Sequence, residues 1–238
     1  IKNNCAERQR LMATSNNPKK RDNGTRNLVI GMVALVVVVA VAVSFGSNRA
    51  KTNAATPSSV EKSEGYGIVF NKGLTSVPKL DIWEDFQCPV CRNFEAVNGK
   101  QIQDWIAQKK VKVVFHVMSF IGAESAYLAN AGACSADEGK FLPMHEAIYV
   151  NQSQTENSGM WSAENILSLG KKLGLTSKKF TDCIANGQYK DWVNNIAADG
   201  NKKNINSTPT VFINGKEMER NNANYFTADG FSKQVFGK

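Results

Sequence analysis

The residues of this chain that can do chemistry are Cys88 and Cys91, separated by the dipeptide Pro89-Val90. A C-x-x-C motif that begins a helix can cycle between a dithiol and a disulfide, because its two sulfurs lie one turn apart. The free N–H groups and the dipole at a helix start favour an anion, so the thiol of Cys88 should ionise below its usual pKa of about 8.5. We therefore expect Cys88 to form mixed disulfides and Cys91 to resolve them.

Two other interpretations of this motif were weighed against the redox one. A zinc site normally takes four ligands, such as two C-x-x-C pairs, and the chain has one such pair. A purely structural disulfide also fits the spacing, and the motif alone leaves that alternative open. The favoured prediction is a redox-active disulfide, with no metal and no separate cofactor.

A second signal lies in the stretch STPTVFING, from Ser207 to Gly215. Pro209 stands directly before a short apolar strand and an Asn-Gly turn, which is a typical position for a cis-proline. An X–Pro bond is the linkage at which the cis form costs little. The sequence therefore predicts a cis bond between Thr208 and Pro209.

The elements around the C-x-x-C motif must place its first cysteine at a helix start. Residues 79–86 alternate and predict a strand that leads into the motif. Pro89 suits the first turn of a helix, where its missing N–H costs nothing, and the helix should continue to about residue 108. Residues 111–118 predict a buried strand, so the three segments form a β-α-β unit with parallel strands.

The rest of the domain is predicted to be helical until its last strands. Residues 124–203 predict several helices. Residues 210–213 and 216–219 predict two short strands joined by Asn-Gly, a strong hairpin signal, and residues 227–236 predict a closing helix. The core or a binding groove should hold the following methionines and tryptophans: Met118, Met144, Met160, Trp83, Trp105, Trp161 and Trp192.

Four stretches over roughly residues 78–216 resemble the thioredoxin superfamily, and more closely the DsbA-like disulfide oxidoreductases. They are WEDFQCPVC, VKVVFHVM, ACSADEGKFLPMHEAIYVNQ and STPTVFING, in the family's order. The resemblance implies an α/β, thioredoxin-like fold with an inserted α-helical subdomain at about residues 122–188. It also implies that Thr208 and Pro209 face the disulfide and bind extended substrates much as an added strand would.

The chain departs from the family at positions that bear on the direction of catalysis. Many relatives carry a buried acid six residues before the first cysteine, where this chain has Ile82. Glu84 shares a strand face with Ile82 and is a better candidate for a proton relay than Asp85, although both acids can also be interpreted as solvated strand-end residues. Val90 stands where the strongest oxidants have a thiolate-stabilising His, so Cys88 should be less acidic and its disulfide less oxidising.

His116 and His145 are the two histidines of the chain. His116 lies in the apolar strand VVFHVM. His145 lies in PMHEAIY, which resembles a family helix where His is a packing residue. Neither has a Cys/His catalytic partner in the sequence, so both are interpreted as packed or partly exposed side chains.

An apolar run from residue 28 to residue 45, LVIGMVALVVVVAVAVSF, precedes the domain. A helix needs about 17 to 25 such residues to cross a bilayer, and a core helix would show a polar face that this run lacks. We expect a single transmembrane helix retained as a signal-anchor, with a cleaved signal as the alternative. Residues 46–64 are small and polar and predict a flexible linker to a folded domain at 65–238.

The net charge of +8 is concentrated before this apolar run. Residues 1–26 hold seven Lys and Arg against two acids. Positive charge beside an apolar helix marks the cytoplasmic side, so residues 1–27 should lie in the cytoplasm and the folded domain outside it. Topology therefore accounts for the basic tail, and we do not expect nucleic acid as a partner.

The five cysteines divide by compartment. Cys5 would lie in the reducing cytoplasm as a free thiol, and the other four would lie where disulfides persist. Cys134 and Cys183 would then form a structural disulfide that closes a loop of roughly 50 residues, worth about 4 kcal/mol in the chain-entropy model. Two free buried thiols and a second redox-active pair are the alternatives.

Together these features predict a membrane-anchored thiol–disulfide oxidoreductase that oxidises exported proteins. Its partners would be folding exported proteins with cysteines and, as the resemblance implies, a quinone-linked membrane protein that reoxidises it. A reductase or isomerase would use the same residues in the opposite direction. A tethered chaperone or binding module is the alternative from another class, and the two cysteines with the Thr-Pro loop argue against it.

Overall fold

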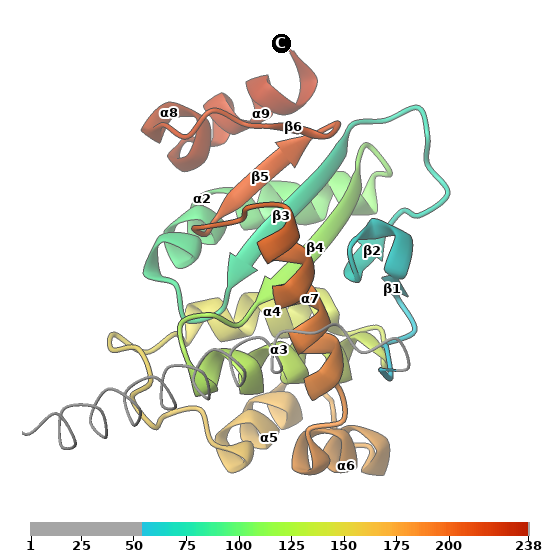
Figure 1. Cartoon of the computed structure of the whole chain (residues 1–238), viewed down its shortest axis with the longest axis vertical. Coiled ribbons are helices and arrows are strands. Elements are labelled where there is room, and N and C mark those ends of the chain that lie inside the picture. The colour runs from blue at the N-terminus through green and yellow to red at the C-terminus, as the bar shows by residue number, and fades with distance from the viewer. Residues whose placement is uncertain (1–53, 238) are drawn as a thin grey trace, which may run out of the picture. The chain divides into compact units, whose positions relative to one another are not determined.

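In a computed structural model, residues 54–237 are described, and they fold around one six-stranded sheet (Figure 1). The strands are β1 (Val60–Glu61), β2 (Gly67–Phe70), β3 (Lys79–Asp85), β4 (Lys112–Met118), β5 (Thr210–Ile213) and β6 (Lys216–Glu217). Their order in the sheet is β1-β2-β4-β3-β5-β6. β3 and β4 run parallel, and the other neighbouring pairs are antiparallel.

Helices cover both faces and both ends of this sheet (Figure 1). They are η1 (Lys62–Glu64), α2 (Pro89–Ala107), α3 (Ala123–Ala136), α4 (Phe141–Val150), α5 (Ala163–Lys172), α6 (Lys178–Asn186), α7 (Lys190–Lys202), α8 (Asn222–Phe226) and α9 (Ala228–Phe236). α2 and α7 lie on opposite faces of the sheet. α3 to α6 gather at the end where β3 and β4 finish, and α8 and α9 lie toward the other end.

The predicted β-α-β unit around the C-x-x-C motif is confirmed. β3 and β4 pair in parallel along their whole length and end at the same edge, with Asp85 opposite Met118. α2 connects them and begins four residues after the end of β3. Cys88 and Cys91 therefore lie at the sheet edge where the two central strands finish.

The predicted hairpin near the C-terminus is also confirmed. Asn214 and Gly215 both have positive φ, 53° and 81°, which is the left-handed geometry that a two-residue hairpin turn requires. β6 ends at Glu217, so the strand predicted at 216–219 is two residues too long. The sequence did not predict β1, β2 and α8, because segments of two to five residues show too little periodicity. The flexible linker predicted at 46–64 is too long, since β1 and η1 occupy residues 60–64 and β1 pairs with β2.

The predicted helical run at 124–203 divides between two structural roles. α3 to α6 pack on one another as a helical layer, in which α3 contacts α4, α5 and α6. α7 instead packs on β4 and on α3, and the indole of Trp192 donates to the carbonyl oxygen of Tyr66 (2.9 Å). The sheet is thus covered on the α7 face by a helix that lies beyond the insertion predicted at 122–188.

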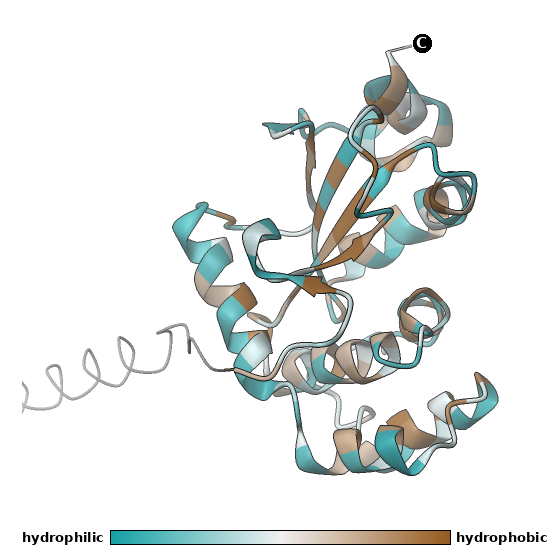
Figure 2. Ribbon diagram, turned by 90° about the vertical axis from the view of Figure 1, so that its right-hand side faces the viewer, coloured by the Kyte–Doolittle hydropathy of each residue, from teal (hydrophilic) through white to brown (hydrophobic). Residues whose placement is uncertain are grey.

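The main core lies between the sheet and α2. It includes the fully buried side chains of Ile68, Leu80, Ile82, Phe94, Ile102 and Val113. Each such side chain contributes about 1.5–3 kcal/mol relative to an exposed one. Figure 2 shows the central strands as mostly hydrophobic, whereas the outer helices alternate between hydrophobic and hydrophilic residues. Of the methionines and tryptophans expected in the core or a groove, Met160 is exposed and the others are buried.

A disulfide joins Cys134 of α3 to Cys183 of α6. The two cysteines are 49 residues apart in the sequence, and both are buried. The side-chain amide of Asn130 lies beside this bond and donates to the carbonyl oxygen of Cys183 (3.5 Å). The bond therefore ties the two helices that bracket the helical layer.

The predicted basic tail, the transmembrane anchor and the first part of the linker, residues 46–53, lie outside the residues that the structure describes. Within residues 54–237, no helix is both long enough and apolar enough to cross a membrane.

We predict that replacing both Cys134 and Cys183 by Ala will lower the free energy of unfolding by about 4 kcal/mol, because the open loop adds entropy to the unfolded chain. Urea unfolding of the variant and the wild type, both with Cys88 and Cys91 oxidised, measures this difference. Under mild reductant the pair Cys88 and Cys91 should be reduced first, so that alkylation in denaturant, which exposes every free thiol, labels these two cysteines first. Early labelling of the other pair would contradict its structural role.

Candidate active site

Cys88 forms the N-cap of α2, just before the first helical residue, Pro89. Its backbone is extended (φ −70°, ψ 118°), and its N–H donates to the carbonyl oxygen of Asp85 (2.9 Å). Pro89 loses no hydrogen bond here, because the first N–H groups of a helix have no partner within the helix. Cys88 is 7% exposed and Cys91, one turn further on, is 0% exposed, so only the first cysteine can meet another protein.

The two free thiols have opposite electrostatic environments. A hydrogen bond from the Cys91 thiol is the main cause that lowers the pKa of Cys88 from 9.0 to about 6. Thr208 and backbone N–H groups at the start of α2 lower this pKa further, and burial opposes them. Burial raises the pKa of Cys91 well above 9.0, and the hydrogen bond to Cys88 and the charge of Glu84 add to it. At neutral pH a Cys88 thiolate thus lies beside a Cys91 thiol, although Val90 provides no stabilising charge.

The loop before β5 closes over Cys88. The bond between Thr208 and Pro209 is cis, and the Sγ atom of Cys88 lies 3.4 Å from the carbonyl oxygen of Thr208. The two motifs, 120 residues apart in the sequence, therefore meet at one site. The hydroxyl of Thr210 accepts a hydrogen bond from Arg220 (2.6 Å), which fixes the start of β5 beside this loop.

Asp85 holds the turn between β3 and α2 to the loop after β4. One carboxylate oxygen accepts from the backbone N–H of Gln87 (2.9 Å) and the hydroxyl of Ser125 (2.6 Å). The other accepts from the N–H groups of Phe120 (3.1 Å) and Ile121 (3.3 Å). Burial raises the pKa of Asp85, and these four donors oppose that shift. This network makes Asp85 a structural residue.

Gln152 supports the same turn from the loop after α4. Its side-chain amide donates to the carbonyl oxygens of Phe86 (2.8 Å) and Cys88 (3.0 Å). The sequence analysis did not single out Gln152, because nothing in its local pattern shows that the loop after α4 returns to the cysteines. The contact fixes the backbone on which the reactive sulfur is carried.

Glu84 is 3% exposed and Asp85 is 0% exposed, so the interpretation of both acids as solvated strand-end residues is wrong. α4 covers this end of β3: the hydroxyl of Tyr149 donates to the carbonyl oxygen of Asp85 (3.3 Å), and His145 reaches Glu84. Burial raises the pKa of Glu84 from 4.5 to about 8, and the charge of Cys88 adds to this, whereas a hydrogen bond with Glu95 opposes it. A carboxyl group with this pKa can exchange protons near neutral pH.

Glu95 and His145 complete a buried group with Glu84, which we call the inner cluster. The Nε2 atom of His145 lies 3.1 Å from Glu84 Oε2, and its Nδ1 atom lies 3.8 Å from Glu95 Oε2. The interpretation of His145 as a packed side chain is correct, but its two acidic partners were missed. Glu95 follows Cys91 by four residues on α2, a spacing that puts both on one helix face and could have indicated it.

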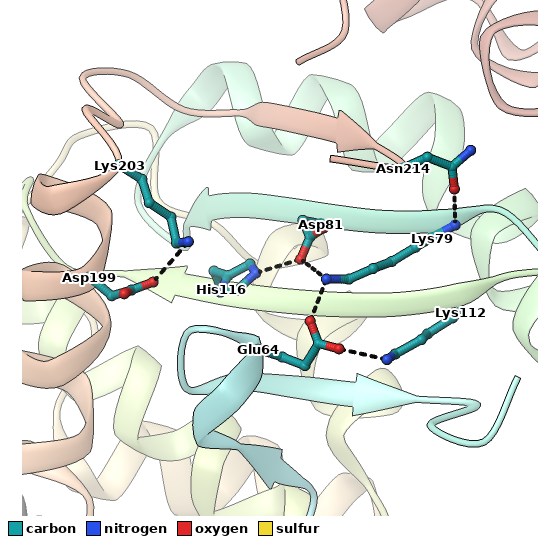
Figure 3. Close-up of polar contacts among 8 residues, drawn as sticks. All are labelled: Glu64, Lys79, Asp81, Lys112, His116, Asp199, Lys203 and Asn214. Atoms are coloured by element: carbon teal, nitrogen blue, oxygen red, sulfur yellow. Dashed lines mark hydrogen bonds and ion pairs between the residues drawn. The ribbon is translucent and has the colours of Figure 1, made fainter. Parts of the chain in front are cut away.

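His116 belongs to a different cluster, on the sheet face that α7 covers. Its ring stacks on Trp83 with 3.8 Å between ring centroids, and its Nε2 atom lies 3.2 Å from Asp81. Figure 3 shows this cluster, in which Lys79 bridges Asp81 and Glu64. A cavity of about 420 Å³ adjoins it, and neither cysteine lines that cavity. His116 is therefore a packed residue away from the redox pair.

Exposed apolar side chains lie on the segments that surround the cysteines. Val90, inside the motif, is 44% exposed, and Phe120, whose N–H is held by Asp85, is 51% exposed. Val150 and Met160, on either side of the loop that carries Gln152, are also exposed. Apolar surface is therefore exposed on the motif itself and on the loops whose residues bond to the turn that carries Cys88.

A family model described as Thioredoxin matches residues 74–233, and the chain therefore belongs to this family. The match includes the cysteines, the cis-proline loop and the helical layer.

Two curated proteins with names that refer to disulfide chemistry are similar to this chain. The chain is 23% identical over 211 residues to "Thiol:disulfide interchange protein DsbA" of Buchnera aphidicola subsp. Schizaphis graminum, covering 86% of this chain and 92% of the relative. It is 29% identical over 148 residues to "Disulfide bond formation protein D" of Bacillus subtilis, covering 59% of this chain and 64% of the relative.

Among solved structures, MdbA, a thiol-disulfide oxidoreductase from Actinomyces oris, has the same fold, with a TM-score of 0.67 at 22% identity over 79% of this chain and 94% of that chain. The protein is a DsbA-like thiol–disulfide oxidoreductase.

We predict that iodoacetamide will alkylate Cys88 of the reduced protein with a midpoint near pH 6, because the thiolate is the reactive form. Cys91 should stay unlabelled through neutral pH. Mass spectrometry of peptides quenched across a pH series measures both. A wild-type midpoint near 9 would show that the thiolate is not stabilised.

Proposed function

We propose that this enzyme is an oxidase that donates its Cys88–Cys91 disulfide to exported proteins. The observation that carries the proposal is the lowered pKa of Cys88. A stabilised thiolate favours the reduced form of the pair, so its disulfide gives up its bond readily to a client dithiol. In a reductase, by contrast, the disulfide form of the cysteine pair would be more stable than the dithiol form.

The exchange proceeds through one mixed disulfide. A client thiolate attacks Cys88 Sγ, the S–S bond breaks, and Cys91 leaves with the electron pair. The second client thiolate then attacks the client sulfur of the mixed disulfide and releases Cys88 as a thiolate. The client is oxidised by two electrons and the enzyme pair is reduced by two.

Cys91 needs a proton as it leaves, because burial disfavours its thiolate. Glu84 is the proposed donor. When ionised it raises the pKa of Cys91, which shows that the two groups interact, and its own pKa of about 8 keeps it mostly protonated at neutral pH. When the pair is reoxidised, the Glu84 carboxylate takes the same proton back.

The proposed client is an extended polypeptide that lies along the Thr208-Pro209 loop. Main-chain groups of such a loop bind a client much as an added strand does and tolerate many side chains. The exposed Val90 and Phe120 support binding of unfolded chains that present apolar residues. A quinone-linked membrane protein is the proposed reoxidising partner.

The equilibrium redox potential of the pair against glutathione tests the direction of catalysis. We predict a value near about −120 to −180 mV, as in strong disulfide donors, whereas a value near about −270 mV would make the enzyme a reductase. Cys91→Ser is the companion variant, because it cannot resolve the mixed disulfide and should accumulate covalent complexes with clients. A folded Cys91→Ser protein that traps no client would instead support a non-catalytic binding module.

The proposed location is the outer side of the cell membrane, with residues 28–45 as the anchor and the basic residues 1–27 in the cytoplasm. The charge of the tail and the length of the apolar run support this topology. Protease added to spheroplasts that make the full chain should then degrade the catalytic domain and leave an epitope on the tail intact. Protection of the domain would refute the topology.

A further inference from the structure

A chain of hydrogen bonds that begins at Arg220 closes the loop before β5. The hydroxyl of Thr210 donates to the carbonyl oxygen of Ser207 (2.7 Å), so one hydrogen bond spans both Thr208 and Pro209. The Nη2 atom of Arg220 donates to the same hydroxyl (2.6 Å). Arg220 follows Thr210 by ten residues and lies after the β5–β6 hairpin. The loop is therefore held by a residue from outside its own turn.

The chemistry of these three groups fixes the direction of both hydrogen bonds. A guanidinium group has only donors, a carbonyl oxygen only accepts, and a hydroxyl has a single proton. Because Arg220 can only donate to the hydroxyl of Thr210, the proton of that hydroxyl points to the carbonyl oxygen of Ser207. A hydrogen bond from a charged donor is stronger than a neutral one, and it polarises the hydroxyl toward its own acceptor. Arg220 therefore strengthens a hydrogen bond that it does not itself make.

Arg220 is exposed, yet its guanidinium group is held in place. The central carbon of this group lies 5.8 Å from the centroid of the Tyr225 ring, within the range of a cation–π contact. Tyr225 is 2% exposed, and its hydroxyl accepts from the backbone N–H of Val211 (3.1 Å). Its carbonyl oxygen accepts from the side-chain amide of Asn98 in α2 (2.7 Å). The guanidinium group thus lies on an aromatic ring that is fixed to both β5 and α2.

Within the described part of the chain, no carboxylate pairs with Arg220. The ion pairs of residues 54–237 do not include it, although Glu217 and Glu219 lie on the same segment and are exposed. An arginine that served only as a surface charge would keep its rotational freedom in solvent, which a fixed side chain gives up. The contact with Thr210 is therefore the main polar contact that the position of Arg220 provides.

The loop that Thr210 closes is the part of the site that an extended client would meet. The carbonyl oxygen of Thr208 lies 3.4 Å from Cys88 Sγ, and Ser207 is exposed beside it. Binding by strand addition depends on the direction of such main-chain groups and tolerates many client side chains. A loop that already has its bound shape does not have to be ordered when the client arrives, and this raises the affinity.

We propose that Arg220 and Thr210 are positioning residues that hold the loop before β5 in the shape that pairs with the main chain of a client. They set the affinity for polypeptides whose cysteines lie in extended, flexible segments, and they leave the thiol chemistry of the cysteine pair unchanged. This inference rests on the proposed function, in which an extended client lies along the Thr208-Pro209 loop. A small dithiol such as dithiothreitol has no main chain and reaches Cys88 without pairing with the loop.

The test compares two reductants of the oxidised full-length protein, an unstructured dithiol peptide and dithiothreitol, in single-turnover reactions at increasing concentration. Arg220→Met keeps an apolar side chain next to the Tyr225 ring but has no donor. The peptide concentration at half-maximal rate should rise about 10-fold, because a hydrogen bond from a charged group is lost. The maximal rate with the peptide and the rate with dithiothreitol should both equal those of the wild type.

Lys216→Met is the matched control for the loss of a positive charge. Lys216 is an exposed cation of β6, the strand that precedes Arg220. Its removal changes the net charge by the same amount as Arg220→Met and leaves the hydrogen bonds of Thr210 in place. The kinetics of this variant with both reductants should equal those of the wild type.

Two variants of Thr210 test the second hydrogen bond of the chain. Thr210→Val keeps the shape of the side chain without its hydroxyl and should raise the half-maximal peptide concentration as Arg220→Met does. Thr210→Ser keeps the hydroxyl and should behave as the wild type. Since both disruptive changes break the same chain of hydrogen bonds, their combination should bind the peptide no more weakly than the worse single variant.

Circular dichroism and the pH midpoint of Cys88 alkylation verify that each variant is folded with a normal nucleophile. Thr210→Val differs from the wild type by one hydroxyl group, so it decides the test if Arg220→Met does not fold.

Wild-type peptide kinetics in both Arg220→Met and Thr210→Val would overturn the proposal. An equal loss with the peptide and with dithiothreitol would also overturn it, because the two residues would then act on the cysteines or on the whole fold. Additive losses in the double variant would show that the two side chains act separately, against the proposal. These outcomes leave the proposed function intact as long as Cys91→Ser still traps clients. Loss of trapping, in contrast, would refute the proposed function itself.

Discussion

The burial of Cys91 beneath Cys88 is the constraint on which the rest of the site depends. One sulfur at a helix start gains hydrogen bonds that favour its anion, while the other, one turn inward, lies where an anion is costly. This difference in pKa between the two thiols requires that the start of α2 be fixed and that the Cys91 sulfur be kept from water. Asp85 and Gln152 meet the first requirement, and the packing of α4 across the end of β3 contributes to the second.

The helical insertion therefore does more than cover the sheet. Ser125 of α3 binds Asp85, His145 and Tyr149 of α4 reach Glu84 and the end of β3, and the loop after α4 brings Gln152 to the backbone of Cys88. The sheet and α2 carry the sulfurs, and the insertion supplies many of the polar groups around them. The shape of the site thus depends on contacts between segments that are about 40 to 66 residues apart.

The sequence alone predicted the parts of this site that are encoded locally. A C-x-x-C motif after an alternating strand indicates a helix start, and Asn214-Gly215 indicates a hairpin, because each depends on the conformations of a few neighbouring residues. The burial of Glu84 and the partners of His145 were not predictable in this way, since they depend on where α4 crosses the sheet edge. The spacing of Glu95 from Cys91 was visible in the sequence. It indicates a buried acid only when one knows that this face of α2 is covered by other elements.

The bond between α3 and α6 has a consequence for how the enzyme itself matures. Under the proposed function the enzyme is an exported oxidase whose own fold contains a disulfide, so each new molecule is itself a substrate of the chemistry it performs. Cys183 is synthesised last of the four cysteines in the domain, so the earlier three are exposed to wrong pairings until α6 is made. Finished molecules would then oxidise Cys134 and Cys183 of newly made ones, so that the formation of active enzyme would be autocatalytic.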